Sequence, residues 1–194
     1  MIRFFIKNSA YICVVFFIGV FNSVTGETLT HSDNASFQVE QISSGLNVPW
    51  GLAFLSSDRL LITQKHGSVS LLNLTNQKVT LIKNAPKVLA NGQGGMLDVA
   101  VSPNYKQDKW IYFTYVKNIE GEGATTLARA QLKNDSVADY AFIAWQDLLV
   151  TRSNTNTDYH FGSRIAFDAA GHVYFGIGDR GVRSSAQDLT NHAG

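Results

Sequence analysis

The sequence predicts an all-β, antiparallel fold, and three features of the residues after about position 37 support this. Apolar residues recur with period two or in short continuous runs, without the pattern of a long amphipathic helix. Gly, Asn, Asp and Ser bound these runs, as they do between strands. A unit of two strands around a polar turn also recurs along the chain, which is typical of a β-propeller. Plentiful aromatic residues and only 3 prolines favour a packed globular domain.

The expected strands follow one another at short intervals. They lie at residues 60–63, 68–72, 78–82, 98–101, 110–116 and 125–130, followed by a strand, an Asp/Gly turn and a strand over 165–177. Lys65-His66-Gly67 separates the first two strands, and its glycine favours a tight hairpin turn. Short strands joined by short polar turns indicate antiparallel sheets.

Three segments of the chain share one outline. Each has an apolar strand that ends in Ala-Phe or Ala-Val, then a polar turn and a second apolar strand; they are residues 50–63, 96–115 and 163–176. The step from Ala53 to Ala100 suits one propeller blade of ~40–50 residues. The step from Ala100 to Ala166 is longer and predicts an insertion near 118–123 or 153–158. A β-sandwich whose hairpins are alike by chance is the alternative.

The chain is too short to close a propeller alone. Such a ring needs ~4–8 blades, and this chain supplies about three at the repeat length above. An open arc would leave sheet faces and edges exposed. We therefore predict that residues 37–194 form a partial β-propeller, the amino-terminal part of a larger protein.

The first 26 residues have the order of a secretory signal peptide. Arg3 and Lys7 give a basic start, residues 11–20 are apolar, and Val24-Thr25-Gly26 offers small residues for cleavage before Glu27. The apolar run is shorter than the ~20 residues that span a bilayer, so we expect cleavage and no stable membrane insertion. Residues 27–36 are polar and are expected to be a flexible start. The protein is therefore expected to be periplasmic or secreted.

Cysteine usage and charge exclude several functions. The single cysteine, Cys13, lies in the signal peptide, so the mature chain has no disulfide, thiol nucleophile or thiolate metal ligand. The formal net charge is +1 and no Lys/Arg run occurs, which gives no electrostatic basis for nucleic-acid binding.

His160 is the first candidate for chemistry. It follows a polar run and directly precedes the predicted strand that begins near Ile165, whereas Asp179 comes just after the partner strand. The antiparallel hairpin thus brings His160 and Asp179 to the same end, where loops on a rigid scaffold present functional groups. A neutral imidazole there can accept a proton near neutral pH, and Asp179 could orient or polarise a neighbouring group. A surface histidine without function is the alternative.

Gln93 lies in a second candidate loop, Gly92-Gln93-Gly94-Gly95-Met96. It is not a phosphate-binding loop, because no Lys-Ser/Thr and no helix follow. Its amide could both donate to and accept from a hydroxylated ligand, although a tight turn between blades would also use these glycines. The histidines share no metal-ligand spacing, and we expect no metal ligands in this chain. The scattered acids Asp98, Asp158 and Asp168 are interpreted as turn or strand-edge residues.

From about Leu46 to Gly194 the chain resembles the soluble aldose sugar dehydrogenases that depend on pyrroloquinoline quinone (PQQ), in the glucose/sorbosone dehydrogenase family. Five motifs carry the resemblance in the family's order: Val48-Pro49-Trp50-Gly51-Leu52-Ala53-Phe54, Gly92-Gln93-Gly94-Gly95-Met96-Leu97-Asp98-Val99-Ala100, His160-Phe161-Gly162-Ser163-Arg164, Gly178-Asp179-Arg180-Gly181 and residues 186–194. Together they cover nearly all of the predicted mature chain.

This resemblance implies a six-bladed β-propeller, of which the chain supplies roughly the first half, with PQQ and calcium near its axis. It implies that His160 is the catalytic base and that Gln93 and Asp179 face the sugar. The reaction it implies oxidises the anomeric C1 hydroxyl of an aldose to the lactone with hydride transfer to PQQ. The partner that then accepts electrons from PQQ is not identified by the sequence. The family's PQQ-contacting arginines, its lysine and its calcium ligands are expected beyond Gly194.

Two other functions are compatible with parts of this pattern. A non-enzymatic extracellular β-propeller could use the same scaffold as a binding module, although it would not need a base such as His160. A lactonase-type calcium propeller would need acidic and amide ligands that converge on the axis, and this half of the sequence does not supply such a set.

Overall fold

The computed structural model describes residues 28–32, 35–136 and 139–194. The chain divides into two compact units, with the boundary between Gln41 and Ile42. The signal peptide predicted over residues 1–26 lies outside the described residues. Within the described part, none of the helices has the length and apolar character needed to cross a membrane.

The first unit contains a β-hairpin. Strand β1 (Thr28–Ser32) pairs with β2 (Ala35–Val39), and Thr28 lies opposite Val39. The sequence predicted only a flexible segment over 27–36, so this pairing is a difference from expectation. Threonine, phenylalanine and valine in these segments favour the extended backbone. A two-stranded hairpin is marginally stable by itself.

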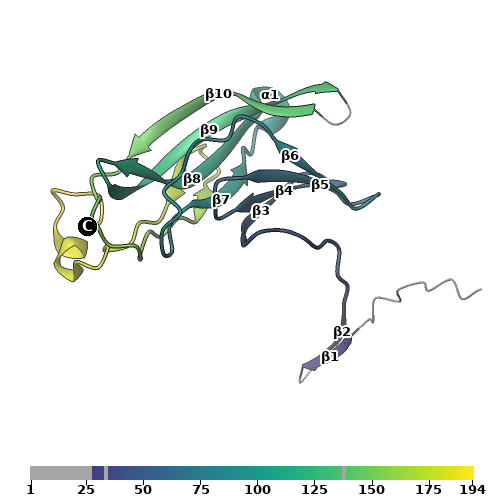
Figure 1. Ribbon diagram of the computed structural model, residues 1–194, viewed down its shortest axis with the longest axis horizontal. Coiled ribbons are helices and arrows are strands. Elements are labelled where there is room, and N and C mark those ends of the chain that lie inside the picture. Colours follow the sequence, from purple (N-terminus) through teal and green to yellow (C-terminus); the bar gives the residue numbers. More distant parts are fainter. Residues whose placement is uncertain (1–27, 33–34, 137–138) are drawn as a thin grey trace, which may run out of the picture. The chain divides into compact units, whose positions relative to one another are not determined.

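The second unit begins with a four-stranded antiparallel sheet, which we call blade 1 (Figure 1). Its strands follow in chain order: β3 (Pro49–Ser56), β4 (Arg59–Gln64), β5 (Val69–Asn73) and β6 (Lys78–Ile82). The predicted hairpin at Lys65-His66-Gly67 is confirmed. Gly67 has φ +103° there, a backbone conformation that glycine adopts without strain.

Blade 2 is a second sheet of four consecutive strands: β7 (Met96–Val101), β8 (Trp110–Ile119), β9 (Glu122–Ser136) and β10 (Asp139–Val150), with one helical turn, α1 (Tyr105–Asp108), between β7 and β8. The sequence predicted an insertion near 118–123 or 153–158, and the first of these positions is not an inserted loop. Glu120 and Gly121 instead form a two-residue hairpin with φ +53° and +97°. The extra length lies in the long strands β8 to β10 and in the following loop, which contains the other predicted position, 153–158.

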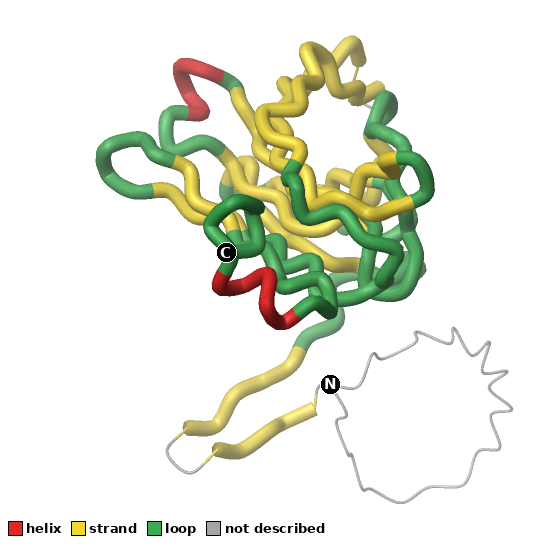
Figure 2. The backbone as a smooth tube through the Cα atoms, turned by 90° about the vertical axis from the view of Figure 1, so that its left-hand side faces the viewer, coloured by secondary structure: helices red, strands yellow, loops and turns green. Residues whose placement is uncertain are grey.

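A short third sheet, also within the second unit, completes the described chain. Strands β11 (Ile165–Phe167) and β12 (Val173–Phe175) form a hairpin, and the segment after them is mostly loop with one short 3-10 helix, η1 (Arg183–Gln187), as Figure 2 shows. The three repeated segments of the sequence are therefore the first two strands of three successive sheets. This regular succession is the arrangement of β-propeller blades.

The core lies between blades 1 and 2. Strand β7 packs against β3 and β4, and the outer strands β6 and β10 also meet. The core contains buried apolar residues from both sheets: Leu61, Val69, Leu71, Ile82, Met96, Val99, Ile111, Phe113, Tyr115, Ala128, Ala130, Tyr140 and Phe142. Blade faces that interdigitate in this way fix one sheet relative to the next.

A buried threonine connects each blade to the next. Thr63 Oγ1 accepts a hydrogen bond from Gly51 N–H in its own sheet (2.8 Å) and donates to the carbonyl of Leu97 in blade 2 (2.6 Å). Thr114 occupies the corresponding position in blade 2, where it accepts from Asp98 N–H (3.0 Å) and donates to the carbonyl of Ser163 (2.9 Å). The repeat in the sequence thus includes a repeated contact between blades.

The β11–β12 hairpin has glycine at this position. Ile165 pairs with Phe175, so the next pair toward the strand ends is Arg164 with Gly176, where Gly176 N–H donates to the Arg164 carbonyl. A Cβ at Gly176 would meet no atom within 4 Å. Gly176 therefore cannot make the contact that Thr63 and Thr114 make.

We expect Thr114→Val to destabilise the protein by about 1–3 kcal/mol, because it leaves the buried Asp98 N–H and Ser163 carbonyl without their partner. Urea unfolding measures the change. Thr80→Val is the matched control: Thr80 is a half-buried strand threonine whose hydroxyl makes no hydrogen bond with the described residues, and its replacement should stay within about 0.5 kcal/mol of wild type. Equal effects of the two changes would show that the hydroxyl contact contributes nothing specific.

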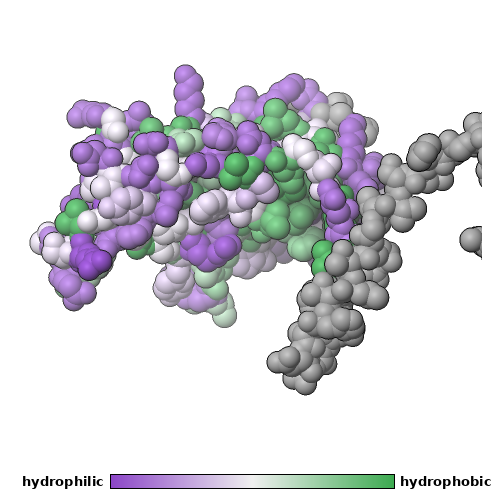
Figure 3. All heavy atoms as spheres, turned by 60° about the horizontal axis from the view of Figure 1, so that its bottom comes forward, coloured by the Kyte–Doolittle hydropathy of each residue, from purple (hydrophilic) through white to green (hydrophobic). Residues whose placement is uncertain are grey.

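An apolar region is exposed on the second unit (Figure 3). Strand β3 is the edge of its sheet and exposes Trp50, Leu52 and Phe54, the last to 65%. Leu52 and Phe54 pair regularly with β4 and share a face as alternate residues, whereas Trp50 lies at a register shift between Pro49 and Leu52. Exposed apolar side chains of this kind are suited to packing against another sheet.

Candidate active site

The loop between β10 and β11, residues 151–164, carries His160 and is anchored on both sides of it. Phe161 is buried against Leu97 and Val116. Its carbonyl accepts a hydrogen bond from the buried hydroxyl of Thr125 (2.8 Å). Blade 2 therefore fixes the residue next to His160, although His160 itself has 53% of its side chain exposed. An exposed imidazole on an anchored backbone is accessible to a ligand without being mobile.

The backbone at His160 has an unusual conformation. Its φ of +57° lies in the left-handed region, which non-glycine residues rarely adopt. Gly178 packs on this backbone so closely that a Cβ there would come within 2.2 Å of the His160 carbonyl oxygen. Gly162 is similarly close to Gly176. Such conformations persist only where the surroundings enforce them, and they are concentrated at functional sites.

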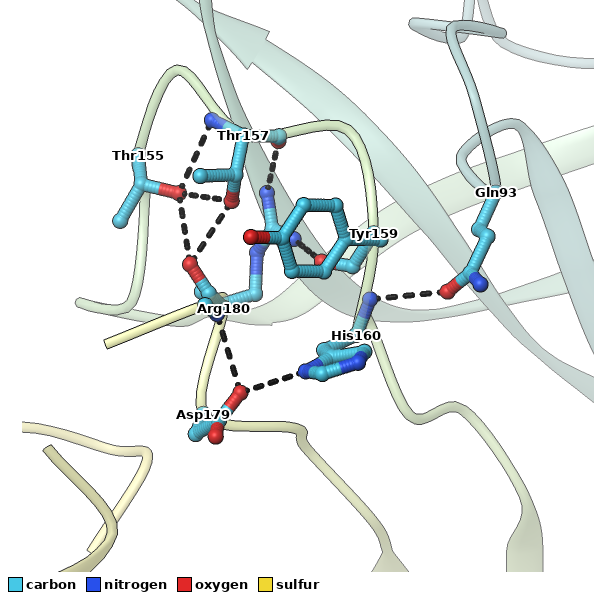
Figure 4. Close-up of polar contacts among 8 residues, drawn as sticks. Gln93, Thr155, Thr157, Tyr159, His160, Asp179 and Arg180 are labelled. Atoms are coloured by element: carbon cyan, nitrogen blue, oxygen red, sulfur yellow. Dashed lines mark hydrogen bonds and ion pairs between the residues drawn. The ribbon is translucent and has the colours of Figure 1, made fainter. Parts of the chain in front are cut away.

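His160 and Asp179 form a hydrogen-bonded pair, in which Nδ1 and Oδ1 are 2.7 Å apart (Figure 4). The contact lowers the pKa of Asp179, and the Gly181 N–H, which also donates to Oδ1 (2.9 Å), adds to this effect. Asp179 is thus ionised at neutral pH and can only accept, so Nδ1 carries the shared proton. In the neutral imidazole, Nε2 then keeps its lone pair and can accept a proton.

Gln93 reaches the same loop from the glycine-rich turn before β7. Its Oε1 accepts a hydrogen bond from the backbone N–H of His160 (2.9 Å), and its own backbone N–H donates to the Asp158 carbonyl (2.6 Å). A Cβ at Gly92 would lie 2.4 Å from Asp158, which explains the first glycine of the turn. Gln93 Nε2 makes no hydrogen bond with the described residues, so it is the part of the amide that is available to a ligand.

The structure therefore brings together all three residues that the sequence singled out. Gln93, His160 and Asp179 form a continuous chain of hydrogen bonds (Figure 4). The resemblance implies that Asp179 faces the sugar, but in the structure one of its carboxylate oxygens is already used within the protein. Its Oδ1 is occupied by His160 and Gly181, and only Oδ2 is open to a ligand among the described residues.

Asp98 has a role that the sequence analysis did not assign. It was interpreted as a turn or strand-edge residue, but it lies inside β7 and is 2% exposed. Its Oδ2 accepts from Ile165 N–H (2.8 Å) and its Oδ1 from Arg164 Nη1 (2.9 Å). Asp98 thus ties blade 2 to the start of β11. The sequence did contain a signal for this role, because Asp98 is a charged residue inside an otherwise apolar strand.

Asp168, by contrast, accepts the Ala170 and His172 N–H groups in the β11–β12 turn, as expected of a turn residue.

Arg180 is the other residue that the sequence analysis passed over. It was quoted only as part of the Gly-Asp-Arg-Gly turn, yet its side chain is 1% exposed and lies next to Thr157 and Tyr159 (Figure 4). No sequence pattern marks it, because its partners are backbone carbonyls.

An open pocket of about 510 Å³ begins two residues after His160. It is lined by Pro49 and Trp50 of β3, by Gly162, Ser163 and Arg164, and by Gly176. The volume falls in the range of ligand pockets, ~300–1,000 Å³. The lining combines an indole, a guanidinium and exposed backbone, which suits a planar or hydroxylated ligand. Within the described residues, no group of three or more His, Cys, Asp or Glu side chains could hold a metal ion.

The chain was compared with known proteins. The sequence model of the family "Glucose / Sorbosone dehydrogenase" matches residues 46–194. The aldose sugar dehydrogenase YliI of Escherichia coli K12 is 31% identical over 159 residues, which cover 80% of this chain and 42% of that protein. The chain thus spans less than half the length of this relative.

Solved structures agree with this match. The apo form of the soluble aldose sugar dehydrogenase from Escherichia coli superposes with a TM-score of 0.72 and 28% identity, over 78% of this chain and 44% of that one. The PQQ-bound aldose sugar dehydrogenase from Streptomyces coelicolor gives a TM-score of 0.66 at 25% identity, over 77% and 43%. The predicted β-propeller fold is confirmed.

Proposed function

The chain belongs to the glucose/sorbosone dehydrogenase family, and on that premise we propose that the protein oxidises the anomeric hydroxyl of aldose sugars to the lactone, with His160 as the general base. The hydrogen bond between His160 Nδ1 and Asp179 is the observation that supports this most directly. It directs the ring's lone pair away from the carboxylate, at a position where 53% of the side chain is exposed. Oxidoreductase action on sugars is also the activity named for the relative YliI and for the two solved structures.

The proposed steps use the three hydrogen-bonded residues. The Nε2 atom of His160 removes the proton from the C1 hydroxyl of the sugar as the C1–H bond is broken. Asp179 stabilises the imidazolium that forms, because its carboxylate already accepts from Nδ1. Gln93 holds the His160 backbone through Oε1 and offers Nε2 to a sugar hydroxyl. PQQ, which a relative of this fold binds, would supply the hydride acceptor once it is bound.

The described residues do not by themselves fit PQQ or calcium. PQQ carries several carboxylates and needs cations around it, yet Arg164, the cation that lines the pocket, is already paired with Asp98. The described residues also lack a carboxylate and histidine cluster for a metal. We therefore assign none of them to either cofactor, and calcium is proposed from the sequence resemblance alone. Export to the periplasm or the medium is likewise a proposal from the predicted signal peptide.

The function is tested with the full-length protein supplied with PQQ, calcium and an artificial electron acceptor. We expect acceptor reduction with a free aldose and the lactone as product, and a slower rate with a sugar deuterated at C1. The methyl glycoside of the same sugar is the matched control, because it has no C1 hydroxyl proton for His160 to remove. Oxidation of the glycoside at the same rate would rule out the proposed reaction. Sugar binding without turnover would support the alternative, a non-enzymatic binding module.

A further inference from the structure

Arg180 is a buried cation without a carboxylate partner. Its side chain is the largest of the fully buried ones among the described residues, and none of the described carboxylates lies within ion-pair distance of it. Burial lowers the pKa of Arg180, whereas the more distant charges of Asp158 and Asp179 oppose that shift. A guanidinium stays protonated in proteins. Because the burial of a lone charge opposes folding, the position needs an explanation other than stability.

The guanidinium is used to hold backbone carbonyls. Nη1 donates to the carbonyl of Tyr159, and Nη2 donates to those of Thr157 (2.7 Å) and Gly123 (3.3 Å). Its centre also lies 3.5 Å from the ring centroid of Phe161, close enough for a cation–π contact. One side chain thus contacts residues 157, 159 and 161, which are alternate positions around His160, and joins them to the start of β9.

The backbone of Arg180 holds the same loop from the other direction. Its carbonyl accepts hydrogen bonds from the hydroxyls of Thr157 (2.7 Å) and Thr155 (3.4 Å) (Figure 4). Arg180 also directly follows Asp179, whose carboxylate accepts from the His160 ring. The turn that supplies the carboxylate and the loop that supplies the imidazole are therefore fastened together at Arg180.

His160 and Arg180, the two residues that this network joins, both have a disfavoured backbone conformation. His160 has φ +57° and Arg180 has φ +54°, in the left-handed region that non-glycine residues seldom occupy. The Tyr159 carbonyl, which Arg180 binds, belongs to the peptide group that directly precedes His160. Contacts at that peptide are well placed to hold His160 in this conformation.

We propose that Arg180 is a positioning residue for His160: its guanidinium fixes the Thr157 and Tyr159 carbonyls and so the angle at which the imidazole meets Asp179. It does not touch the sugar. The effect of Arg180 on sugar oxidation rests on the proposed function, whereas its effect on the orientation of the His160 ring does not. Three carbonyls at fixed places require a planar fork of donors, which lysine lacks.

Two variants of the full-length protein test this, Arg180→Met and Arg180→Lys. The readout is the ¹⁵N NMR signals of the His160 ring, which report which nitrogen carries the proton. We expect a single Nδ1-protonated form in the wild type and a mixture of forms in both variants. The turnover number should fall about 10²-fold, since a displacement of ~1 Å has effects of that size, and KM should change less.

Arg129→Met is the matched control. Arg129 also lies over an aromatic ring, Trp110, but its guanidinium bonds the Gln146 side chain and no backbone carbonyl of the described residues, so the His160 signals should be unchanged.

The outcomes separate positioning from general stability. A lower melting temperature with wild-type His160 signals would overturn the proposal, and so would full rescue by lysine, because charge alone would then suffice. If neither variant folds, Thr157→Val keeps the arginine and removes one hydroxyl that binds its carbonyl; His160 signals should still shift, and unchanged signals would again overturn the proposal. Altered signals in a protein that oxidises no sugar would refute the proposed function and leave the positioning role standing.

Discussion

Replacement of His160 by alanine is expected to lower the turnover number for aldose oxidation about 10²–10⁴-fold, the usual effect of removing a general base. Steady-state kinetics on the protein loaded with PQQ and calcium measure it. The KM for the sugar should change less, because the lost interaction is a proton transfer and not a binding contact. The melting temperature should move little, since the imidazole is half exposed and contributes no core packing.

The chain contains a matched control for this experiment. His172 forms the same kind of pair with Asp168, with Nδ1 and Oδ2 2.7 Å apart, in the exposed turn between β11 and β12. His172→Ala removes an imidazole–carboxylate contact without touching the candidate site, so turnover should stay at the wild-type value. If His160→Ala also turned over sugar at the wild-type rate, the base would have to be another group, and His160 would be an ordinary surface histidine.

Local patterns predicted much of the second unit. Strand β6 has the same bounds that were expected, because the alternating Lys78-Val79-Thr80-Leu81-Ile82 run is bounded by polar turns. The proximity of His160 and Asp179 followed from hairpin geometry, since the two residues flank an antiparallel pair. Both results depend only on residues close in the sequence or on the regular spacing of strands.

Contacts between distant segments were harder to predict. Gln93 and His160 are 67 residues apart, and only the resemblance to a known family placed both in one site. Thr63 and Thr114 are ordinary β-forming residues in the sequence, and the hydrogen bonds that join the blades become visible only in three dimensions. Arg180 was missed because its partners are carbonyl groups, which every residue has. The part of the site that the sequence does not reveal is therefore the set of hydrogen bonds that hold its backbone.

Asp179→Asn is expected to lower the turnover number by about 10²–10⁴-fold, although it keeps the size and shape of the side chain. If the amide nitrogen faces Nδ1, it donates there and moves the ring proton to Nε2, which can then no longer accept from the sugar. If the amide oxygen faces Nδ1, the negative charge that stabilises the imidazolium is missing. In the serine-protease triad the corresponding change reduces turnover about 10⁴-fold.

The split between kcat and KM decides what Asp179 does. Its Oδ1 binds His160 and Gly181, so the loss should appear in kcat with a smaller change in KM, and the NMR signals of the His160 ring should change with it. Asp168→Asn alters the equivalent surface pair with His172 and should leave both kinetic constants unchanged. A raised KM at a wild-type kcat would mean that Asp179 serves the sugar, as the sequence resemblance alone implies, and that His160 acts without its carboxylate.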